Sequence, residues 1–384
     1  MKICQLIDFV NVGGAGIAAN RIADAMLAVE DVEICQISNH QRHGSKNITC
    51  LQNSRKMEIL KFCSKYLRRS YLEKFVNYDI CRQLEKILKR EKPDIINVHN
   101  IHSAGWPIGL IRSCLKHSPV SWTLHDCWSF LGSYYPKHTP AAPKKLKREL
   151  DAFWEFQHPN LTATTPSKWM QEEAASSHWS NSKITVIHNP IPRNFFEYKK
   201  ANTCKEALGL KTNIPTILVI SGNINEERKG GEILKSILES NITDKAQFVL
   251  IGTGDSFQNE NIKSIGFIRD EITIQIAYHA ADILVHPAPV DNFPNTIAES
   301  ISCGNPVLAF NVGGIPEMVI PEKSGWLIND IGATPMLDML KNIISNESYR
   351  NLRKSTQEIG INLFDTKNIG HSYLNCYKEI ISSK

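Results

Sequence analysis

Short apolar runs alternate with helical stretches along most of this 384-residue chain, and this alternation restricts its fold more than any other feature. Strands that alternate with helices are typical of parallel sheets. A chain of this length forms two cores more readily than one. We therefore predict an α/β protein with two doubly wound, Rossmann-like domains. The expected strands lie at residues 2–7, 33–37, 94–98, 120–124, 161–165 and 184–187, and then at 215–220, 248–251, 282–285 and 306–310.

The composition is that of an ordinary globular protein, with 42% hydrophobic and 22% charged residues. The formal charge of +5 is too small to indicate nucleic-acid binding, but it allows a local basic patch. The ten cysteines include no Cys-x-x-Cys pair, which favours reduced thiols in a cytosolic protein. We see neither a signal peptide nor an apolar run of about eighteen residues, so we expect a cytoplasmic protein.

The stretch 286–306 connects an expected buried strand to an expected helix at residues 296–302. Asp291 lies in the connecting loop, and Glu299 lies about one turn inside the helix. Ligands of open parallel sheets bind beyond the carboxyl ends of the strands, so both acids are expected to face one crevice. A helix start suits a phosphate, and a carboxylate suits sugar hydroxyls. Alone, the pair is weak evidence, because it equally describes a turn residue and a solvated helix residue.

A glycine-rich turn follows the first expected strand and opens a helix, with the order Gly13, Gly14, Ala15, Gly16. This spacing does not fit Gly-x-Gly-x-x-Gly, which counts against a nicotinamide dehydrogenase. Glycines allow a ligand to approach the backbone closely, because no Cβ intervenes. A plain tight turn is the alternative.

Polar residues also end three expected strands of the first half, at 99–102, 125–128 and 166–168, and parallel strands place them at one sheet edge. His125 is therefore a candidate binding residue, and Asp126 is placed either to orient its imidazole or to hold an acceptor. In the second half, Arg228 and Lys229 follow a strand and precede a helix. Two cations there would stabilise a negatively charged ligand.

The acid pair at 291 and 299, followed by Gly304-Asn305-Pro306, resembles the signature of the retaining GT-B glycosyltransferases of family 4. The stretches 123–126 and 228–230 resemble the same family. The resemblance implies that Asp291 and His125 contact a donor sugar and that Glu299 holds the nucleotide ribose. It further implies that Arg228 and Lys229 grip the donor diphosphate. The glycine turn and the loop after Asp291 would complete the donor site with Gly13, Gly14, Ala15, Gly16, Asn292, Phe293, Pro294, Asn295 and Thr296.

The resemblance also implies a GT-B architecture, with two Rossmann-like domains facing a central cleft. Residues 1–190 would form the acceptor-side domain, with the helix at 367–384 packing back on it, and residues 191–366 would bind the nucleotide sugar. The family's substrates are a UDP- or GDP-linked sugar and a glycan or polyprenyl-diphosphate-linked acceptor, as in bacterial capsule, exopolysaccharide or lipopolysaccharide assembly. No Asp-x-Asp triplet occurs, so we expect neither a metal clamp nor a cofactor.

The chain has two basic segments, at 55–69 and 137–148. In the first, cations interleave with apolar residues, and the second is a run rich in lysine. Such segments can rest on an anionic membrane face, and a solvated helix and loop are the alternative. Peripheral attachment to the inner face of the cell membrane follows from the first interpretation. For the site itself, two other functions stay open: a GT-B-type sugar-nucleotide epimerase or hydrolase, and a non-catalytic nucleotide-binding scaffold.

Overall fold

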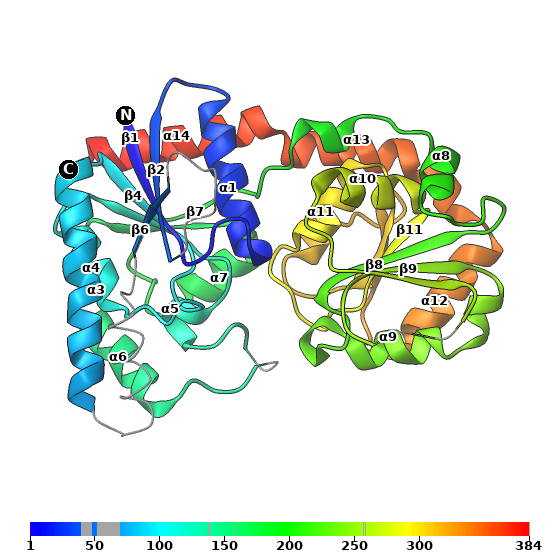
Figure 1. Ribbon diagram of the computed structural model, residues 1–384, viewed down its shortest axis with the longest axis horizontal. Coiled ribbons are helices and arrows are strands. Elements are labelled where there is room, and N and C mark those ends of the chain that lie inside the picture. Colours follow the sequence, from blue (N-terminus) through cyan, green and yellow to red (C-terminus); the bar gives the residue numbers. More distant parts are fainter. Residues whose placement is uncertain are drawn as a thin grey trace. The chain divides into compact units, whose positions relative to one another are not determined.

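The structure is a computed structural model that describes residues 1–39, 48–51, 70–136, 139–156, 158–255, 257 and 259–383, and the side chains of these except 70–72. The described chain forms two compact units (Figure 1). The first contains residues 1–136, 140–188 and 367–384, and the second contains residues 189–366. The division after residue 188 lies close to the one expected after residue 190. Each unit has its own parallel sheet.

The first unit is built on a seven-stranded sheet whose strands have the order β3-β2-β1-β4-β5-β6-β7. Every neighbouring pair in this sheet is parallel. The strands are β1 (Lys2–Leu6), β2 (Glu33–Ser38), β3 (Ile48–Cys50), β4 (Ile95–Val98), β5 (Val120–Thr123), β6 (Leu161–Thr165) and β7 (Ile184–Val186). β4 and β5 are buried along their whole length, as expected for central parallel strands covered by helices on both faces.

The helices of the first unit include α14, which comes from the end of the chain. They are α1 (Gly13–Leu27), α3 (Ser70–Glu91), α4 (Gly109–Leu115), α5 (Trp128–Leu131), α6 (Lys144–Trp154), α7 (Lys168–Ala175) and α14 (Thr366–Ser382). Ile22 of α1 and Tyr373 of α14 share one hydrophobic cluster with Ile3 of β1. A Cβ on Gly370 would lie 2.2 Å from the carbonyl oxygen of Ala25, so α14 approaches α1 closely only because this residue is glycine.

The second unit repeats the architecture with a six-stranded parallel sheet of order β10-β9-β8-β11-β12-β13. Its strands are β8 (Thr216–Asn223), β9 (Gln247–Thr253), β10 (Ile262–Gly266), β11 (Ile283–His286), β12 (Val307–Phe310) and β13 (Gly325–Ile328). Its helices are α8 (Ala201–Ala207), α9 (Gly231–Leu238), α10 (Glu271–Ala280), α11 (Asn295–Ser302), α12 (Ala333–Ser345) and α13 (Arg353–Phe364). Two hydrophobic clusters pack against this sheet.

The prediction of two doubly wound α/β domains is confirmed. β3, β10 and β13 were not predicted: β3 has three residues, β10 carries Lys263 and Ser264 between its apolar positions, and β13 has four residues. These strands were missed because they are short or partly exposed, and their apolar pattern is correspondingly weak. The expected helix at 347–361 is a 3-10 turn at Ser348–Leu352 followed by α13.

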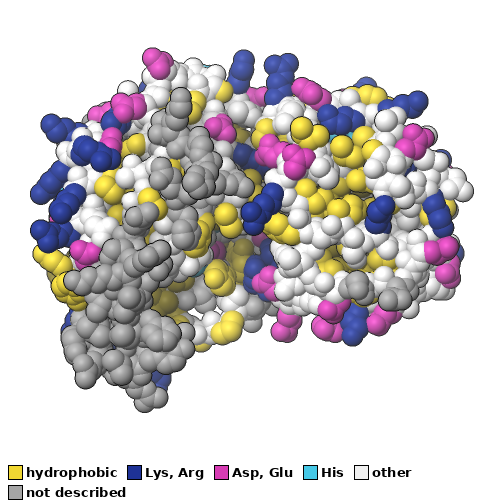
Figure 2. All heavy atoms as spheres, in the orientation of Figure 1, with side chains coloured by type: hydrophobic (Ala, Val, Ile, Leu, Met, Phe, Trp, Pro, Cys, Tyr) yellow, Lys and Arg dark blue, Asp and Glu magenta, His cyan; other side chains and the backbone are white. Residues whose placement is uncertain are grey.

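No cysteine in the described part of the chain forms a disulfide bond. Within the same residues, no helix combines the length and the hydropathy that a membrane crossing requires. Figure 2 shows basic and acidic side chains interspersed over the coloured part of one face, in line with the modest formal charge of +5.

Candidate active site

The loop after β11 contains the first acid of the predicted pair, Asp291. The lysine that forms an ion pair with it lies in the short loop just before α9. Asp291 is 5% exposed, and its Oδ2 accepts a hydrogen bond from Nζ of Lys229 at 2.6 Å. Nε2 of His286, the last residue of β11, lies 3.4 Å from the same oxygen. Burial alone would raise the pKa of Asp291, but the charge of Lys229 and the contact with His286 lower this pKa well below its usual range. Asp291 is therefore an ionised, acceptor-only group.

Two glycines fix the backbone around this ion pair. Gly230 has a φ of 81°, and a Cβ there would lie 2.0 Å from the carbonyl oxygen of Pro287. Gly313 has a φ of 56°, and its Cβ would lie 1.8 Å from the carbonyl oxygen of Asp291. Only glycine fits such positions without moving the neighbouring chain. The loops that carry Lys229 and Asp291 are thus packed backbone to backbone against neighbouring loops.

The second acid of the pair is held by a tyrosine that the sequence did not indicate. Glu299 is 7% exposed on α11, and the hydroxyl of Tyr278 donates to its Oε2 at 2.7 Å. Tyr278 is fully buried on α10. The hydroxyl orients the carboxylate, which can still accept further hydrogen bonds because it has two oxygens.

The loop between the two acids divides into buried and partly accessible residues. Asn292, Phe293 and Pro294 are buried, and Asn295 and Thr296 are half-buried. The Phe293 ring packs edge-on to Phe364 at 6.0 Å within the core. Phe293 therefore anchors the loop through its side chain, and a ligand contact there would involve its backbone. Asn295 Oδ1 accepts from Asn189 Nδ2 at 3.1 Å, which ties the start of α11 to the beginning of the second unit.

The two predicted cations occupy different surroundings. Arg228 forms an ion pair with Glu226 at 2.7 Å inside the short loop before α9, whereas Lys229 pairs with Asp291. Both side chains are 24% exposed. Because both precede the N-terminus of α9, their charges add to the partial positive charge of that helix end.

A hollow of about 450 Å³ opens beside the ends of β9 and β10. Gly252 and Gly254 line it, and a Cβ on Gly252 would lie 2.0 Å from the carbonyl oxygen of Ser221. The other lining residues are Ile224, Leu250, Thr253, Asp255, Ser264, Ile265, Gly266 and Phe267. Its volume falls within the range of small-molecule sites.

In the first unit, the glycines of the turn before α1 have separate roles. Gly13 has a φ of 67°, and a Cβ on Gly16 would lie 2.2 Å from the carbonyl oxygen of Phe9. A Cβ on Gly14 would meet nothing within 4 Å, and Gly14 is exposed. Gly13 and Gly16 are thus needed for the turn itself, while Gly14 and the half-buried Ala15 lie where a ligand can approach.

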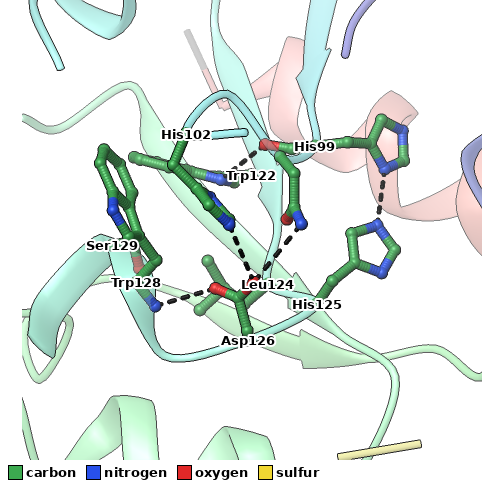
Figure 3. A pocket seen from close by; sticks show the side chains of 9 residues that line it. His99, His102, Trp122, Leu124, His125, Asp126, Trp128 and Ser129 are labelled. Carbon is green, nitrogen blue, oxygen red and sulfur yellow. Dashed lines mark hydrogen bonds and ion pairs between the residues drawn. The ribbon is translucent and has the colours of Figure 1, made fainter. Parts of the chain in front are cut away.

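The polar residues after β4 and β5 meet at one sheet edge, as predicted (Figure 3). Nδ1 of His99 lies 2.9 Å from Nε2 of His125. Burial, with a smaller contribution from His102, lowers the pKa of His125 to about 4, and burial lowers the pKa of His99 well below its usual range. Both rings are therefore neutral at physiological pH. The third cluster has a local role, since Ser167 caps α7 by accepting from the Met170 N–H.

Asp126 is engaged by other groups of this cluster. Its Oδ1 accepts from the Trp128 N–H at 2.9 Å, and its Oδ2 lies 3.4 Å both from His102 Nε2 and from Asn100 Nδ2. The cavity inside the cluster measures about 10 Å³, far too small for a sugar ring. A sugar therefore does not fit among these side chains, and only groups at the outer edge of the cluster could contact a substrate.

The sequence interpretation missed four residues of these networks: His99, Tyr278, His286 and Gln5, whose Nε2 lies 3.4 Å from Nε2 of His99. His99 and His286 had the signal of a polar residue at the carboxyl end of a strand. Gln5 and Tyr278 had none, because a polar residue inside a strand or helix does not reveal its partner in another element. No group of three or more His, Cys, Asp and Glu side chains in the described residues is placed to hold a metal ion.

The basic segment 55–69 lies outside the described residues. In the second basic segment, α6 begins at Lys144, and Lys145 forms ion pairs with Glu73 and Glu149. Lys144, Lys147 and Arg148 are exposed on this helix, while Leu150 and Phe153 are buried. This part of the segment is therefore an amphipathic helix with a basic outer face.

Two family models match the sequence, one in each half. The model of Glycosyltransferase Family 4 matches residues 12–195, and that of Glycosyl transferases group 1 matches residues 215–346. The chain is a GT-B glycosyltransferase.

Three curated bacterial proteins are similar to this GT-B glycosyltransferase. It is 24% identical to an uncharacterized 41.2 kDa protein in the cps region of Klebsiella pneumoniae, over 76% of this chain and 81% of the relative. It is 21% identical to the putative colanic acid biosynthesis glycosyl transferase WcaC of Escherichia coli, over 77% and 78%. It is 26% identical to the Escherichia coli UDP-Gal:alpha-D-GlcNAc-diphosphoundecaprenol alpha-1,3-galactosyltransferase, over 65% and 66%.

Solved structures share its fold over the whole chain. Sucrose-phosphate synthase from Thermosynechococcus elongatus matches with a TM-score of 0.77 at 15% identity, covering 100% of both chains. The Anabaena protein Alr3699/HepE, in complex with UDP-glucose, matches with a TM-score of 0.72 at 16% identity, again over 100% of both chains. At these identities the likeness establishes the fold of the glycosyltransferase, and its substrates need separate arguments.

Proposed function

We propose that this protein is a retaining glycosyltransferase that moves a sugar from a nucleotide-sugar donor to a glycan or lipid-linked acceptor. The observation that carries the proposal is the ion pair of Lys229 with the buried Asp291 at the carboxyl ends of β8 and β11. An ionised carboxylate accepts hydrogen bonds from sugar hydroxyls, and the adjacent cation serves a phosphate leaving group.

The second unit offers a place for each part of a nucleoside diphosphate sugar. The hollow beside β9 and β10 would take the base, with the 57% exposed Phe267 at its edge as a stacking surface. Glu299 would accept from the ribose hydroxyls, and Tyr278 would hold that carboxylate in place. Arg228, Lys229 and the first amides of α9 would balance the diphosphate. We expect UDP or GDP, and the Anabaena protein with UDP-glucose has the same fold.

In this mechanism the second unit stabilises a departing nucleoside diphosphate. Lys229 would neutralise charge that develops on the leaving oxygen, while Asp291 and His125 position the sugar. We expect no covalent enzyme nucleophile and no metal. The acceptor would attack from the face of the leaving group, and the diphosphate would take the acceptor's proton. The new glycosidic bond then replaces the sugar–phosphate bond with retention at the anomeric carbon.

The names of the relatives point to surface polysaccharides. One relative is a putative colanic acid transferase, and another is named for a diphosphoundecaprenol-linked acceptor. We extend to this protein an acceptor that is a glycan or a polyprenyl-diphosphate-linked sugar. The basic outer face of α6, with Lys144, Lys147 and Arg148, together with the segment 55–69, would attract the anionic membrane surface in which such acceptors lie.

The test is product analysis with UDP- and GDP-sugars labelled in the sugar, incubated with and without a lipid fraction that contains polyprenyl-diphosphate-linked saccharides. We expect the label to enter the lipid fraction with one donor, and NMR of the product to show the anomeric configuration of that donor. Free labelled sugar or an epimer, with no acceptor consumed, would identify a hydrolase or epimerase instead. Nucleotide binding without any turnover would favour the scaffold.

A further inference from the structure

Four polar side chains form a continuous row across the sheet of the first unit. They are Gln36 of β2, Gln5 of β1, and His99 and His125 at the ends of β4 and β5, which are neighbours in that order. The contacts along the row are 3.0 Å from Gln36 Nε2 to Gln5 Oε1, 3.4 Å from Gln5 Nε2 to His99 Nε2, and 2.9 Å from His99 Nδ1 to His125 Nε2. The first three side chains are less than 9% exposed. The row connects the sheet interior to His125.

The backbone determines which end of the Gln5 amide faces His99. Gln5 Nε2 donates to the carbonyl oxygen of Ala19 in α1 at 3.2 Å, and a carbonyl oxygen can only accept. Gln5 Oε1 in turn accepts from Gln36 Nε2. A flipped amide would place two oxygens against each other at Ala19 and two NH₂ groups against each other at Gln36. The nitrogen of Gln5 is therefore the atom next to His99.

An amide nitrogen is a donor only, so His99 Nε2 must be the acceptor of this contact. If His99 carried its proton on Nε2, two N–H groups would face each other at 3.4 Å. Since burial keeps His99 neutral, its single ring proton lies on Nδ1. That proton is directed at His125 (Figure 3). The Trp122 indole donates to the His99 backbone carbonyl at 3.1 Å and holds the residue in place.

We propose that Gln5 and His99 are positioning residues that hold His125 as the tautomer with its proton on Nδ1. His125 Nε2 accepts from His99, so the ring's own proton must occupy the other nitrogen. The cavity lined by His99 and His125 is too small for a sugar, and Gln5 is fully buried, so Gln5 and His99 act through His125. The kinetic consequence rests on the proposed function: the donor sugar would meet a hydrogen-bond donor at Nδ1 of His125.

The test is nitrogen NMR of the full-length protein labelled with ¹⁵N-histidine, which distinguishes protonated from unprotonated ring nitrogens. The signals of His125 are identified by their loss in His125→Asn. In the wild type we expect a protonated Nδ1 and an unprotonated Nε2. In His99→Asp, a carboxylate replaces the donor, so Nε2 of His125 should become protonated. A wild-type ring with its proton on Nε2, or an unchanged ring in His99→Asp, would overturn the proposal.

Gln5→Met provides a second variant in case His99→Asp does not fold, because methionine has a similar size and cannot donate. It should release His99 and shift the His125 ring signals toward an average of the two tautomers. Gln247→Met is the matched control: Gln247 is a buried strand glutamine of the second unit that donates to Thr216 and the Lys211 carbonyl. It should leave the His125 signals unchanged. Equal spectra for Gln5→Met and the control would exclude a role for Gln5.

Activity measurements separate this inference from the proposed function. If His125 donates to the sugar, His99→Asp should lower kcat/KM by roughly tenfold, the equivalent of one hydrogen bond. The tautomer measurement needs no substrate, so it stands even if the chain proves to have another activity. If the protein is a transferase and its kcat/KM is unaffected when the His125 proton moves to Nε2, the kinetic consequence is contradicted and the proposed function stays intact.

Discussion

Nζ of Lys229 lies 2.6 Å from Oδ2 of Asp291, and the carboxylate has only 7% of its side chain exposed. The two residues are 62 positions apart and come from separate loops, at the start of α9 and after β11. The pair keeps a buried carboxylate ionised. In the proposed function, Lys229 would share its charge between Asp291 and an incoming diphosphate, which would link donor binding to the state of the acid.

Breaking this pair should reveal a strong energetic coupling. Lys229→Met leaves Asp291 without its cation and should lower the free energy of unfolding by about 2 kcal/mol. The double variant with Asp291→Asn should lose about 1 kcal/mol less than the sum of the single variants. Chemical denaturation measures all four proteins. The exposed Arg350–Glu347 pair, at 2.9 Å, is the control and should show no measurable coupling. Additive effects at 229 and 291 would show that the contact is energetically unimportant.

Tyr278→Phe should weaken nucleotide binding although Tyr278 is fully buried. The substitution removes only the hydroxyl that orients Glu299. We expect a three- to tenfold loss of affinity, in line with about 1 kcal/mol for one hydrogen bond, and a larger loss for Glu299→Ala. Calorimetry with the preferred nucleoside diphosphate measures both. Tyr349→Phe, another buried tyrosine of the second unit, should bind normally. If Tyr278→Phe also binds normally, Glu299 does not depend on this hydroxyl.

Gly313→Ala should displace the backbone of the loop that carries Asp291. The new Cβ would lie 1.8 Å from the carbonyl oxygen of Asp291, and the φ of 56° disfavours alanine. We expect a loss of stability above about 2 kcal/mol and a lower transfer rate at saturating donor. Gly332→Ala is the matched control, because its Cβ would meet only Pro335 at an ordinary 3.6 Å. Similar behaviour of the two variants would mean that the loop adapts freely.

The buried histidines should make stability depend on pH. The pKa of His125 and that of His279 are each lowered to about 4, mainly by burial. The unfolded chain binds protons at these residues below about pH 6.5 while the folded chain does not, so stability falls as the pH drops from 6.5 toward 4. Each residue contributes up to about 1.4 kcal/mol per pH unit. His125→Asn and His279→Asn should each flatten the slope of unfolding free energy against pH by about one proton. Unchanged slopes would show that these histidines titrate alike in both states.

The sequence allowed the α/β class, two domains and most strands to be predicted, because central parallel strands are continuous apolar runs and are easily recognised. It also selected Asp291, Arg228, Lys229 and His125 as candidates through their places near strand ends, and Glu299 through its place in the following helix. It did not show that Lys229 pairs with Asp291 or that His99 contacts His125. Such partners are set by the order of strands in the sheet, which short-range patterns do not encode. Asp126, which was expected either to orient the His125 imidazole or to hold an acceptor, lies against His102 in the structure.

The central claim is that the second unit binds a nucleoside diphosphate through Glu299 and the cations before α9. Isothermal titration calorimetry of the full chain against UDP, GDP and ADP tests it most directly. We predict that UDP or GDP binds with one site per chain, that Glu299→Ala weakens this binding by roughly 10- to 100-fold, and that Lys235→Ala, an exposed lysine of α9, binds as the wild type does. Binding of none of the three nucleotides, or equal affinity in Glu299→Ala, would contradict the account.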